Sequence, residues 1–178
     1  MSAVDIHAMP GGYAAEVTKD DLRAGAIFDR GTFINVCGTQ GPLHDARGRT
    51  VCSYLRHNHP TFRPTRILDL GCSIGQATLA FPKHFPKAQV HAVDVAAPLL
   101  RYAHARAEAL GQRVHFSQQN AEATAFPDNH FDLVVSHLLF HETSTPALDN
   151  IIRECHRVLR PGGMMIHLEL GLPYKDMD

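Results

Sequence analysis

A glycine-rich turn that follows an apolar segment is the feature of this sequence that could bind a ligand. The segment reads RILDLGCSIGQATLAF, in which Asp69 closes the apolar run and Gly71, Ser73 and Gly75 follow. A second acid, Asp94, stands at the end of the next apolar run, QVHAVDV. A carboxylate at such a point can accept hydrogen bonds from both hydroxyls of a ribose. The pattern therefore predicts a site for a nucleoside.

The same turn lacks what loops that bind diphosphates require. A dinucleotide loop reads G-x-G-x-x-G, but from Gly71 this chain reads GCSIGQ, so Ser73 and Gln76 take the second and third glycine positions. No Gly-Lys-Ser/Thr follows, so the turn is not a Walker A loop. An oxidoreductase that binds NAD(H) is therefore disfavoured. The candidate ligand is S-adenosylmethionine, a nucleoside without a diphosphate.

Alternating strands and helices must position these residues. The pattern predicts an α/β fold with a Rossmann-like, doubly wound, mostly parallel sheet, whose ligand site lies at the carboxyl ends of the strands. Asp94, Asn120, Ser136 and His137 all fall at predicted strand ends, as does the glycine-rich turn. The predicted strands are RILDL, QVHAVDV, RVHFS, FDLVVS and MMIHLEL; the helices between them start at Gly75, Ala97 and Thr145, and the last ends at Pro161-Gly162.

At these motifs the chain resembles the class I S-adenosylmethionine-dependent methyltransferases, in particular the group that includes the ubiquinone-biosynthesis-type methyltransferases. The resemblance covers residues 66–170, more than half of the chain. It rests on four pieces in the right order: ILDLGCSIG, HAVDV, QQNAEATAFPDNHFDLVVS, and HRVLRPGG before a strand. It implies methyl transfer from S-adenosylmethionine to oxygen, nitrogen or carbon of a small molecule. The alternative is a non-catalytic cofactor-binding or interaction module of the same fold.

The resemblance also implies residue roles. Asp94 would hold the ribose, Val95 would pack on the adenine, and Asn120 with the Ala121 N–H would meet the adenine edge. The family usually has Asp where this chain has Asn120, and Gly where it has Ser73; a serine there is tolerable if its backbone is unstrained. The residues expected to bind the cofactor are Asp69, Gly71, Cys72, Ser73, Gly75, Asp94, Val95, Asn120, Ala121 and Ser136.

Two histidines after the fourth predicted strand are the catalytic candidates. If this segment is helical, His137 and His141 share one face, and either could take a proton from the acceptor. The alternative is that both are polar wall residues or are bonded to the backbone. The segment SHLLF lacks the Asn/Asp-Pro-Pro-aromatic motif of many methyltransferases that act on DNA and proteins, so a small-molecule substrate is favoured.

The two ends of the chain differ from the middle. Residues 1–63 are predicted to form a helical cap that contacts substrate, with a loose start, a helix from Thr18, a loop from Gly31 to Gly48, and a short helix before Pro60. Residues 64–178 form the Rossmann-like domain, truncated after strand five, so the C-terminal strands of the family are expected to be missing. A second copy of the chain, as a homodimer, or another partner is then expected to cover the open edge of strand five.

Composition argues against several classes of partner. The net charge is −1 and Lys and Arg are scattered, which disfavours nucleic acid and membrane partners. The four cysteines form no CxxC pair, and the start of the chain lacks a signal-peptide pattern, so free thiols in a cytoplasmic protein are expected. Although the chain has 13 histidines, no set of them has the spacing of a zinc site, and no metal is expected.

Overall fold

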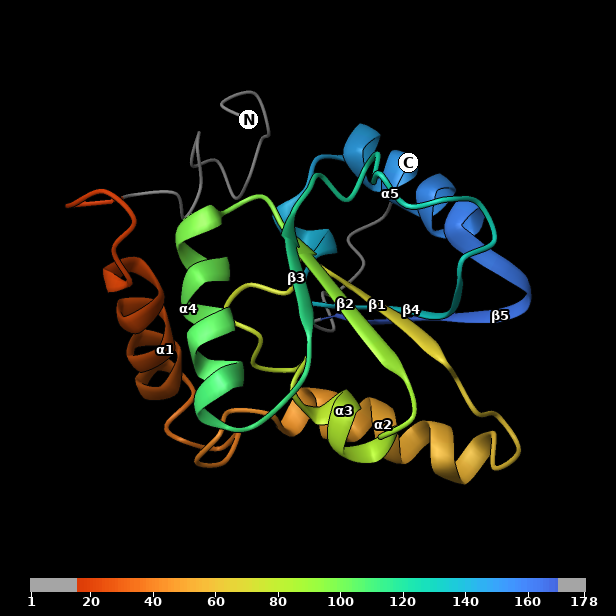
Figure 1. The fold of residues 1–178 in the computed structure, drawn as a ribbon, viewed down its shortest axis with the longest axis horizontal. Helices are drawn as coiled ribbons and strands as arrows, with labels where there is room; N and C mark the ends of the chain where they lie inside the picture. Colours follow the sequence, from red (N-terminus) through yellow and green to blue (C-terminus); the bar gives the residue numbers. More distant parts are fainter. Residues whose placement is uncertain (1–15, 170–178) are drawn as a thin grey trace, which may run out of the picture.

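A five-stranded parallel sheet forms the centre of the molecule (Figure 1). The computed structural model describes residues 16–169. The strand order is β3-β2-β1-β4-β5, so the order reverses between the neighbours β1 and β4. This confirms the predicted doubly wound α/β fold. The strands are β1 (Arg66–Leu70), β2 (Gln89–Asp94), β3 (His115–Gln118), β4 (Phe131–His137) and β5 (Leu159–Leu168).

Helices cover both faces of this sheet (Figure 1). One face carries α2, α3 and α4, and the other carries α5. The helix α1 packs on α4 rather than on the sheet. No described helix has the length and hydropathy needed to cross a bilayer. The helices are α1 (Arg23–Asn35), α2 (Ala46–Asn58), α3 (Ala80–His84), α4 (Ala97–Ala109) and α5 (Thr145–Val158), with a short 3-10 turn, η1 (Phe140–Glu142).

Alternation along the strands produces two apolar layers, one on each side of the sheet. In β1, Ile67 enters the layer under α2, while Leu68 and Leu70 enter the layer under α5. The residues of α2 in the first layer are Val51, Cys52 and Leu55, and those of α5 in the second are Ile151, Cys155 and Val158. Because α2 shares the sheet core, the stretch before β1 is fixed to the rest of the molecule.

The loop predicted from Gly31 to Gly48 is confirmed only for residues 36–45; its bounds are wrong, because α1 continues to Asn35 and α2 begins at Ala46. Gly48 lies inside α2, where an added Cβ would be 2.1 Å from the carbonyl oxygen of Ala77. The glycine permits close packing and does not mark a loop. The predicted helix start at Thr18 is also wrong: the Asp21 carboxylate accepts hydrogen bonds from the backbone N–H groups of Val17, Thr18 and Arg23, and this turn delays α1 to Arg23.

Two further boundaries differ from prediction. The helix expected from Gly75 is regular only in α3, because the chain between β1 and α3 forms consecutive turns. Pro161 and Gly162 do not end α5; they lie within β5, at a register shift in the pairing with β4. Such an irregularity tolerates a proline, which has no N–H to donate, on an edge strand. The expectations for residues 1–15 and for residues after Glu169 lie outside the described part of the chain.

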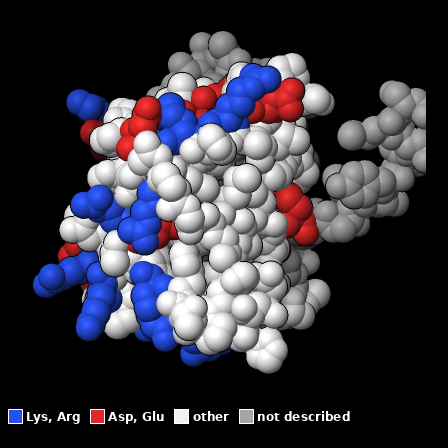
Figure 2. All heavy atoms as spheres, turned by 90° about the vertical axis from the view of Figure 1, so that its right-hand side faces the viewer, with Lys and Arg blue, Asp and Glu red and all other residues white. Residues whose placement is uncertain are grey.

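Charged side chains do not form one continuous basic surface on the face shown in Figure 2. Blue and red groups alternate along its upper margin, Lys and Arg follow its left side, and the centre is uncharged. Some basic side chains are neutralised by neighbours: Arg157 pairs with Glu154 and Asp128, and Arg160 with Asp132. The distribution agrees with a net charge of −1.

Candidate functional site

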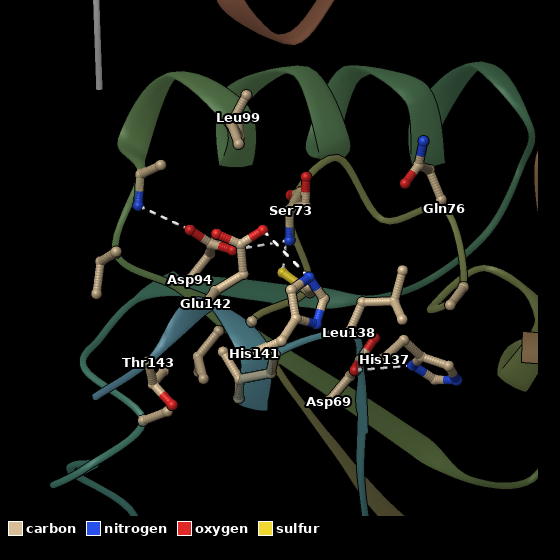
Figure 3. Close-up of a pocket in the computed structure, with 18 of the residues that line it drawn as sticks. Asp69, Ser73, Gln76, Asp94, Leu99, His137, Leu138, His141, Glu142 and Thr143 are labelled. Atoms are coloured by element: carbon tan, nitrogen blue, oxygen red, sulfur yellow. Dashed lines mark hydrogen bonds and ion pairs between the residues drawn. The ribbon is translucent and has the colours of Figure 1, made fainter. Parts of the chain in front are cut away.

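A cavity of about 530 Å³ opens at the carboxyl ends of β1, β2 and β4. Its walls come from the turn after β1, the end of β2, the loops after β3 and β4, the helix α1 and the start of α2. Figure 3 shows the part around Asp69, Asp94 and His141. The cavity lies where the strand order reverses, the usual ligand position in a doubly wound sheet. Its volume suits a small ligand, for which pockets of roughly 300–1,000 Å³ are typical.

The turn after β1 is held in a left-handed conformation at three positions. The φ angles of Gly71, Ser73 and Gly75 are 66°, 51° and 74°. This turns the Ser73 N–H toward the Asp94 carboxylate, to which it donates a hydrogen bond of 2.8 Å. Because Ser73 has a side chain, a left-handed φ strains its backbone. An unstrained backbone, the condition for a serine to replace the family's glycine here, is therefore not met. At Gly71 an added Cβ would be 2.7 Å from Leu139 Cδ1, so the loop after β4 closes onto the turn.

Asp94 connects the turn to the helix that follows β2. One carboxylate oxygen accepts the Ser73 N–H, and the other accepts the Ala96 N–H at 2.8 Å, just before α4 (Figure 3). Burial raises the pKa of Asp94, and these backbone donors oppose that shift. Asp94 also lines the cavity, and each oxygen has a second lone pair to offer a ligand. The residue therefore fixes the turn and faces the cavity at once.

Asp69 lies behind the turn with 1% of its surface exposed. The Thr78 hydroxyl donates to one of its oxygens at 2.6 Å, and the other oxygen is 3.6 Å from His137 Nδ1. Both Asp69 and His137 line the cavity (Figure 3). The Thr78 hydrogen bond ties the Asp69 carboxylate to the turn, whereas its 3.6 Å contact with His137 is too long for a hydrogen bond.

His141 is fixed by acidic residues from two segments. Its Nδ1 is 2.9 Å from Glu169 Oε2, and its Nε2 is 3.4 Å from Glu142 Oε1. His137 and His141 do not share a helical face, because β4 extends through His137, Leu138 has a φ of 58°, and η1 is only three residues long. The two rings nevertheless border the same cavity.

The structure separates the other predicted binding residues into two groups. Cys72, Val95, Asn120 and Ala121 line the cavity, and burial raises the pKa of the Cys72 thiol. Gly75 and Ser136 are not part of its wall. Gly75 packs beside Phe116 and Ala103. Ser136 is fully buried, and its hydroxyl is 2.8 Å from Nδ1 of His167, its partner on β5.

Sequence reasoning missed the wall that α1 and the start of α2 contribute. The Gln76 amide nitrogen donates to Thr32 Oγ1 at 2.9 Å and to His44 Nδ1 at 2.7 Å. In this arrangement Nδ1 accepts, so the ring proton of His44 is on Nε2, and burial lowers the pKa of His44. In the sequence, Gln76 indicates only that the third glycine of a dinucleotide loop is absent. No sequence pattern marks Thr32, His44 or Arg47 as neighbours of the turn.

Comparison with known proteins agrees with this architecture. A family model described as a methyltransferase domain matches residues 67–163, which contain the turn, Asp94 and the strand-four loop. The chain belongs to the class I S-adenosylmethionine-dependent methyltransferases. A demethylmenaquinone methyltransferase of Thermus thermophilus is 38% identical over 112 residues, which cover 63% of this chain and 50% of that protein. The chain spans about half the length of the curated relatives it matches.

Two solved structures are similar to this chain in both fold and sequence. Phosphoethanolamine N-methyltransferase 2 of Haemonchus contortus, in complex with S-adenosyl-L-methionine, has 27% identity and a TM-score of 0.58 over 67% of this chain and 27% of its own. The [4+2]-cyclase SpnF has 30% identity and a TM-score of 0.60 over 71% of this chain and 46% of its own.

Proposed function

We propose that this methyltransferase chain binds S-adenosylmethionine in the cavity and transfers its methyl group to oxygen, nitrogen or carbon of a small-molecule acceptor. The observation that carries the proposal is Asp94, which ends β2, fixes the glycine-rich turn through Ser73 and faces the cavity. The family match and the names of relatives such as demethylmenaquinone methyltransferase support the same activity.

The charges of the cavity fit this cofactor. Among the described residues that line it, four are carboxylates and one is an arginine. S-adenosylmethionine carries a positive sulfonium, a positive amine and one carboxylate, whereas a dinucleotide would bring two phosphates into an acidic wall. The carboxylates are those of Asp69, Asp94, Glu122 and Glu142, and the arginine is Arg47.

We assign residue roles by their place in this wall. Asp94 accepts hydrogen bonds from the ribose, while Val95, Asn120 and Ala121 surround the adenine. Gly71, Cys72 and Ser73 border the methionine part, which needs the close backbone approach that the turn allows. Asp69 positions the turn through Thr78. Gly75 and Ser136, which lie outside the wall, support the turn and β4 by packing and hydrogen bonding.

The cofactor would supply a methyl group already activated by its positive sulfur, so that a lone pair on the acceptor can displace S-adenosylhomocysteine in line. The chain then has to align the acceptor and exclude water. Where the acceptor must lose a proton, His141 is the first candidate to take it, because the residue lines the cavity and Glu169 orients its ring through Nδ1. His137, whose Nδ1 is 3.6 Å from Asp69 in the same wall, is the second candidate.

The acceptor is proposed to enter beside the N-terminal wall. The division into a cap of residues 1–63 and a Rossmann-like domain of residues 64–178 remains a proposal. It is supported by the contribution of the cap to the cavity, which is partly apolar and so suits an organic acceptor. The cap residues in this wall are Phe28, Thr32, Asn35, Val36, His44 and Arg47.

Partner and location follow as further proposals. A small-molecule acceptor, with no nucleic acid or membrane partner, is supported by the near-neutral charge and by the uncharged centre of the face in Figure 2. A cytoplasmic location is supported by four free thiols.

A homodimer, or another partner, that covers β5 is supported by Met165, which is 42% exposed on that strand. Light scattering after size exclusion tests the dimer, and a monomer at all concentrations refutes it.

Calorimetric titration with S-adenosylmethionine and S-adenosylhomocysteine tests the binding proposal. The chain should bind both, and Asp94→Ala should weaken both by about 100-fold, the loss expected for two charge-assisted hydrogen bonds. Asp149→Ala, a change at an exposed residue of α5, is the matched control and should bind as the unchanged chain does. Tighter binding of NADH, or equal affinity in Asp94→Ala, would refute the proposal. Binding with no transfer to any acceptor in a broad screen would favour the non-catalytic module.

A further inference from the structure

Arg47 is the one cation in the wall of the cavity, among the described residues that line it. It is the second residue of α2, and its side chain is partly buried. The N-cap residue of α2 is Asp45, but its carboxylate makes no capping hydrogen bond and pairs with Arg49, and the first turn of the helix holds no acidic residue. Cations are normally disfavoured at this end of a helix. The position therefore calls for an anion.

No described carboxylate pairs with Arg47. Arg49, two residues further along the same helix, pairs with Asp45 at 3.1 Å. Arg106 donates a hydrogen bond to the Leu43 carbonyl oxygen. Arg47 has neither an ion pair nor a hydrogen bond from its side chain to any described residue. Burial lowers the pKa of Arg47, and no neighbouring carboxylate opposes this shift. A partly desolvated guanidinium of this kind costs free energy unless a ligand pairs with it.

The packing of α2 fixes where this guanidinium lies. Gly48 lets the helix approach the backbone of Ala77, and Gln76 bonds to His44, so the start of α2 is held against the 76–77 part of the turn. Asp94 braces the same turn at Ser73. A ligand with its ribose on Asp94 and its chain along the turn would reach Arg47 with its far end.

We propose that Arg47 binds the carboxylate of the methionine part of S-adenosylmethionine. The inference rests on the proposed function and adds to it the residue that recognises the anionic end of the cofactor. A guanidinium can bind a carboxylate through two parallel N–H···O bonds, which fixes orientation as well as affinity. The four carboxylates of the wall would repel the carboxylate of the methionine part, whereas the Arg47 guanidinium carries the opposite charge.

The test compares two ligands in two chains by calorimetry. The ligands are S-adenosylmethionine and decarboxylated S-adenosylmethionine, which lacks only the carboxylate in question. Arg47→Gln should weaken binding of the first by about 10- to 100-fold, the effect of losing a charge-assisted bidentate contact. It should change binding of the second by less than about 2-fold. Arg49→Gln, the same substitution at an arginine outside the wall, should change neither affinity.

Three results would overturn the inference. Arg47→Gln could bind S-adenosylmethionine as the unchanged chain does, which is also the result expected if Arg47 binds an acceptor. It could lose both ligands equally, which would mean a structural role. Arg49→Gln could lose as much, which would mean a general charge effect. Arg47→Lys keeps the charge without the planar fork and gives the same selective loss at smaller size if Arg47→Gln does not fold. If the unchanged chain binds neither ligand, the proposed function fails instead.

Discussion

Replacing Gly48 by alanine tests whether close packing of α2 on the turn holds the cavity wall together. In an isolated helix this change would stabilise by about 1 kcal/mol, because alanine is a far better helix former. In this chain the new Cβ would be 2.1 Å from the Ala77 carbonyl oxygen and 2.9 Å from Ala80 Cβ. The first neighbour is backbone and cannot rotate away. Overpacking of this kind costs roughly 1–3 kcal/mol, and a backbone clash belongs at the upper end.

We therefore expect Gly48→Ala to lower the free energy of unfolding by about 2 kcal/mol and Tm by about 4–8 °C. Gly31→Ala is the matched control: Gly31 lies inside α1, and an added Cβ there meets no atom within 4 Å. It should stabilise by about 0.5–1 kcal/mol. Urea and thermal unfolding measure both. If Gly48→Ala is as stable as the unchanged chain, or if the two variants shift together, α2 does not pack on Ala77 as described. Gly48→Ala should also weaken binding of S-adenosylhomocysteine, since it displaces Arg47.

Three further predictions concern single sites. Ser73→Gly relieves a φ of 51° and should raise stability by about 0.5 kcal/mol in thermal unfolding; a loss would mean that the serine side chain stabilises the turn. At Asp132, burial raises the pKa, but hydrogen bonds from Thr65 and Arg66 and the charge of Arg160 hold it below the usual value. This carboxylate therefore stabilises above about pH 4 and loses its effect as the pH falls; Asp132→Ala should cost about 3 kcal/mol in urea unfolding at pH 7 and less at pH 3. Burial lowers the pKa of His167 to about 4, so the unfolded chain takes up this proton at a higher pH than the folded chain does. The free energy of unfolding should therefore fall as the pH is lowered from about 6.5 to 4. NMR titration should show a neutral His167 ring at pH 5, and a charged ring at that pH would contradict the prediction.

The parallel sheet and its ligand edge could be predicted because local signals agree there. RILDL and FDLVVS are short apolar runs bounded by turn residues, and the 97–109 helix has an apolar stripe and a glycine after it. The position of Asp94 beside the cavity could be predicted because, in this fold, ligands bind at the carboxyl ends of the strands. The turn was found from residue types alone, but the strained backbone of Ser73 became visible only in the structure.

The N-terminal wall could not be predicted, since its residues are brought together by long-range contacts. Gly48 suits a loop by composition, and only its approach to Ala77 explains a glycine inside a helix. His44 is near the turn because Gln76 bonds to it across 32 residues. Ser136 was placed at the site by its position at a strand end, but its hydroxyl is taken by His167 on the neighbouring strand. That pairing depends on the register of β5, which begins earlier than Met164 because Pro161 and Gly162 are accommodated within the strand.

A crystal structure of the chain with S-adenosylhomocysteine tests the central claim most directly. The account predicts electron density for one ligand in the cavity at the β1–β4 reversal, with the ribose hydroxyls on Asp94 and the amino-acid part along the turn from Gly71 to Gln76. Density elsewhere on the molecule, or an empty cavity at a ligand concentration that saturates binding in solution, would contradict the assignment of this cavity as the cofactor site.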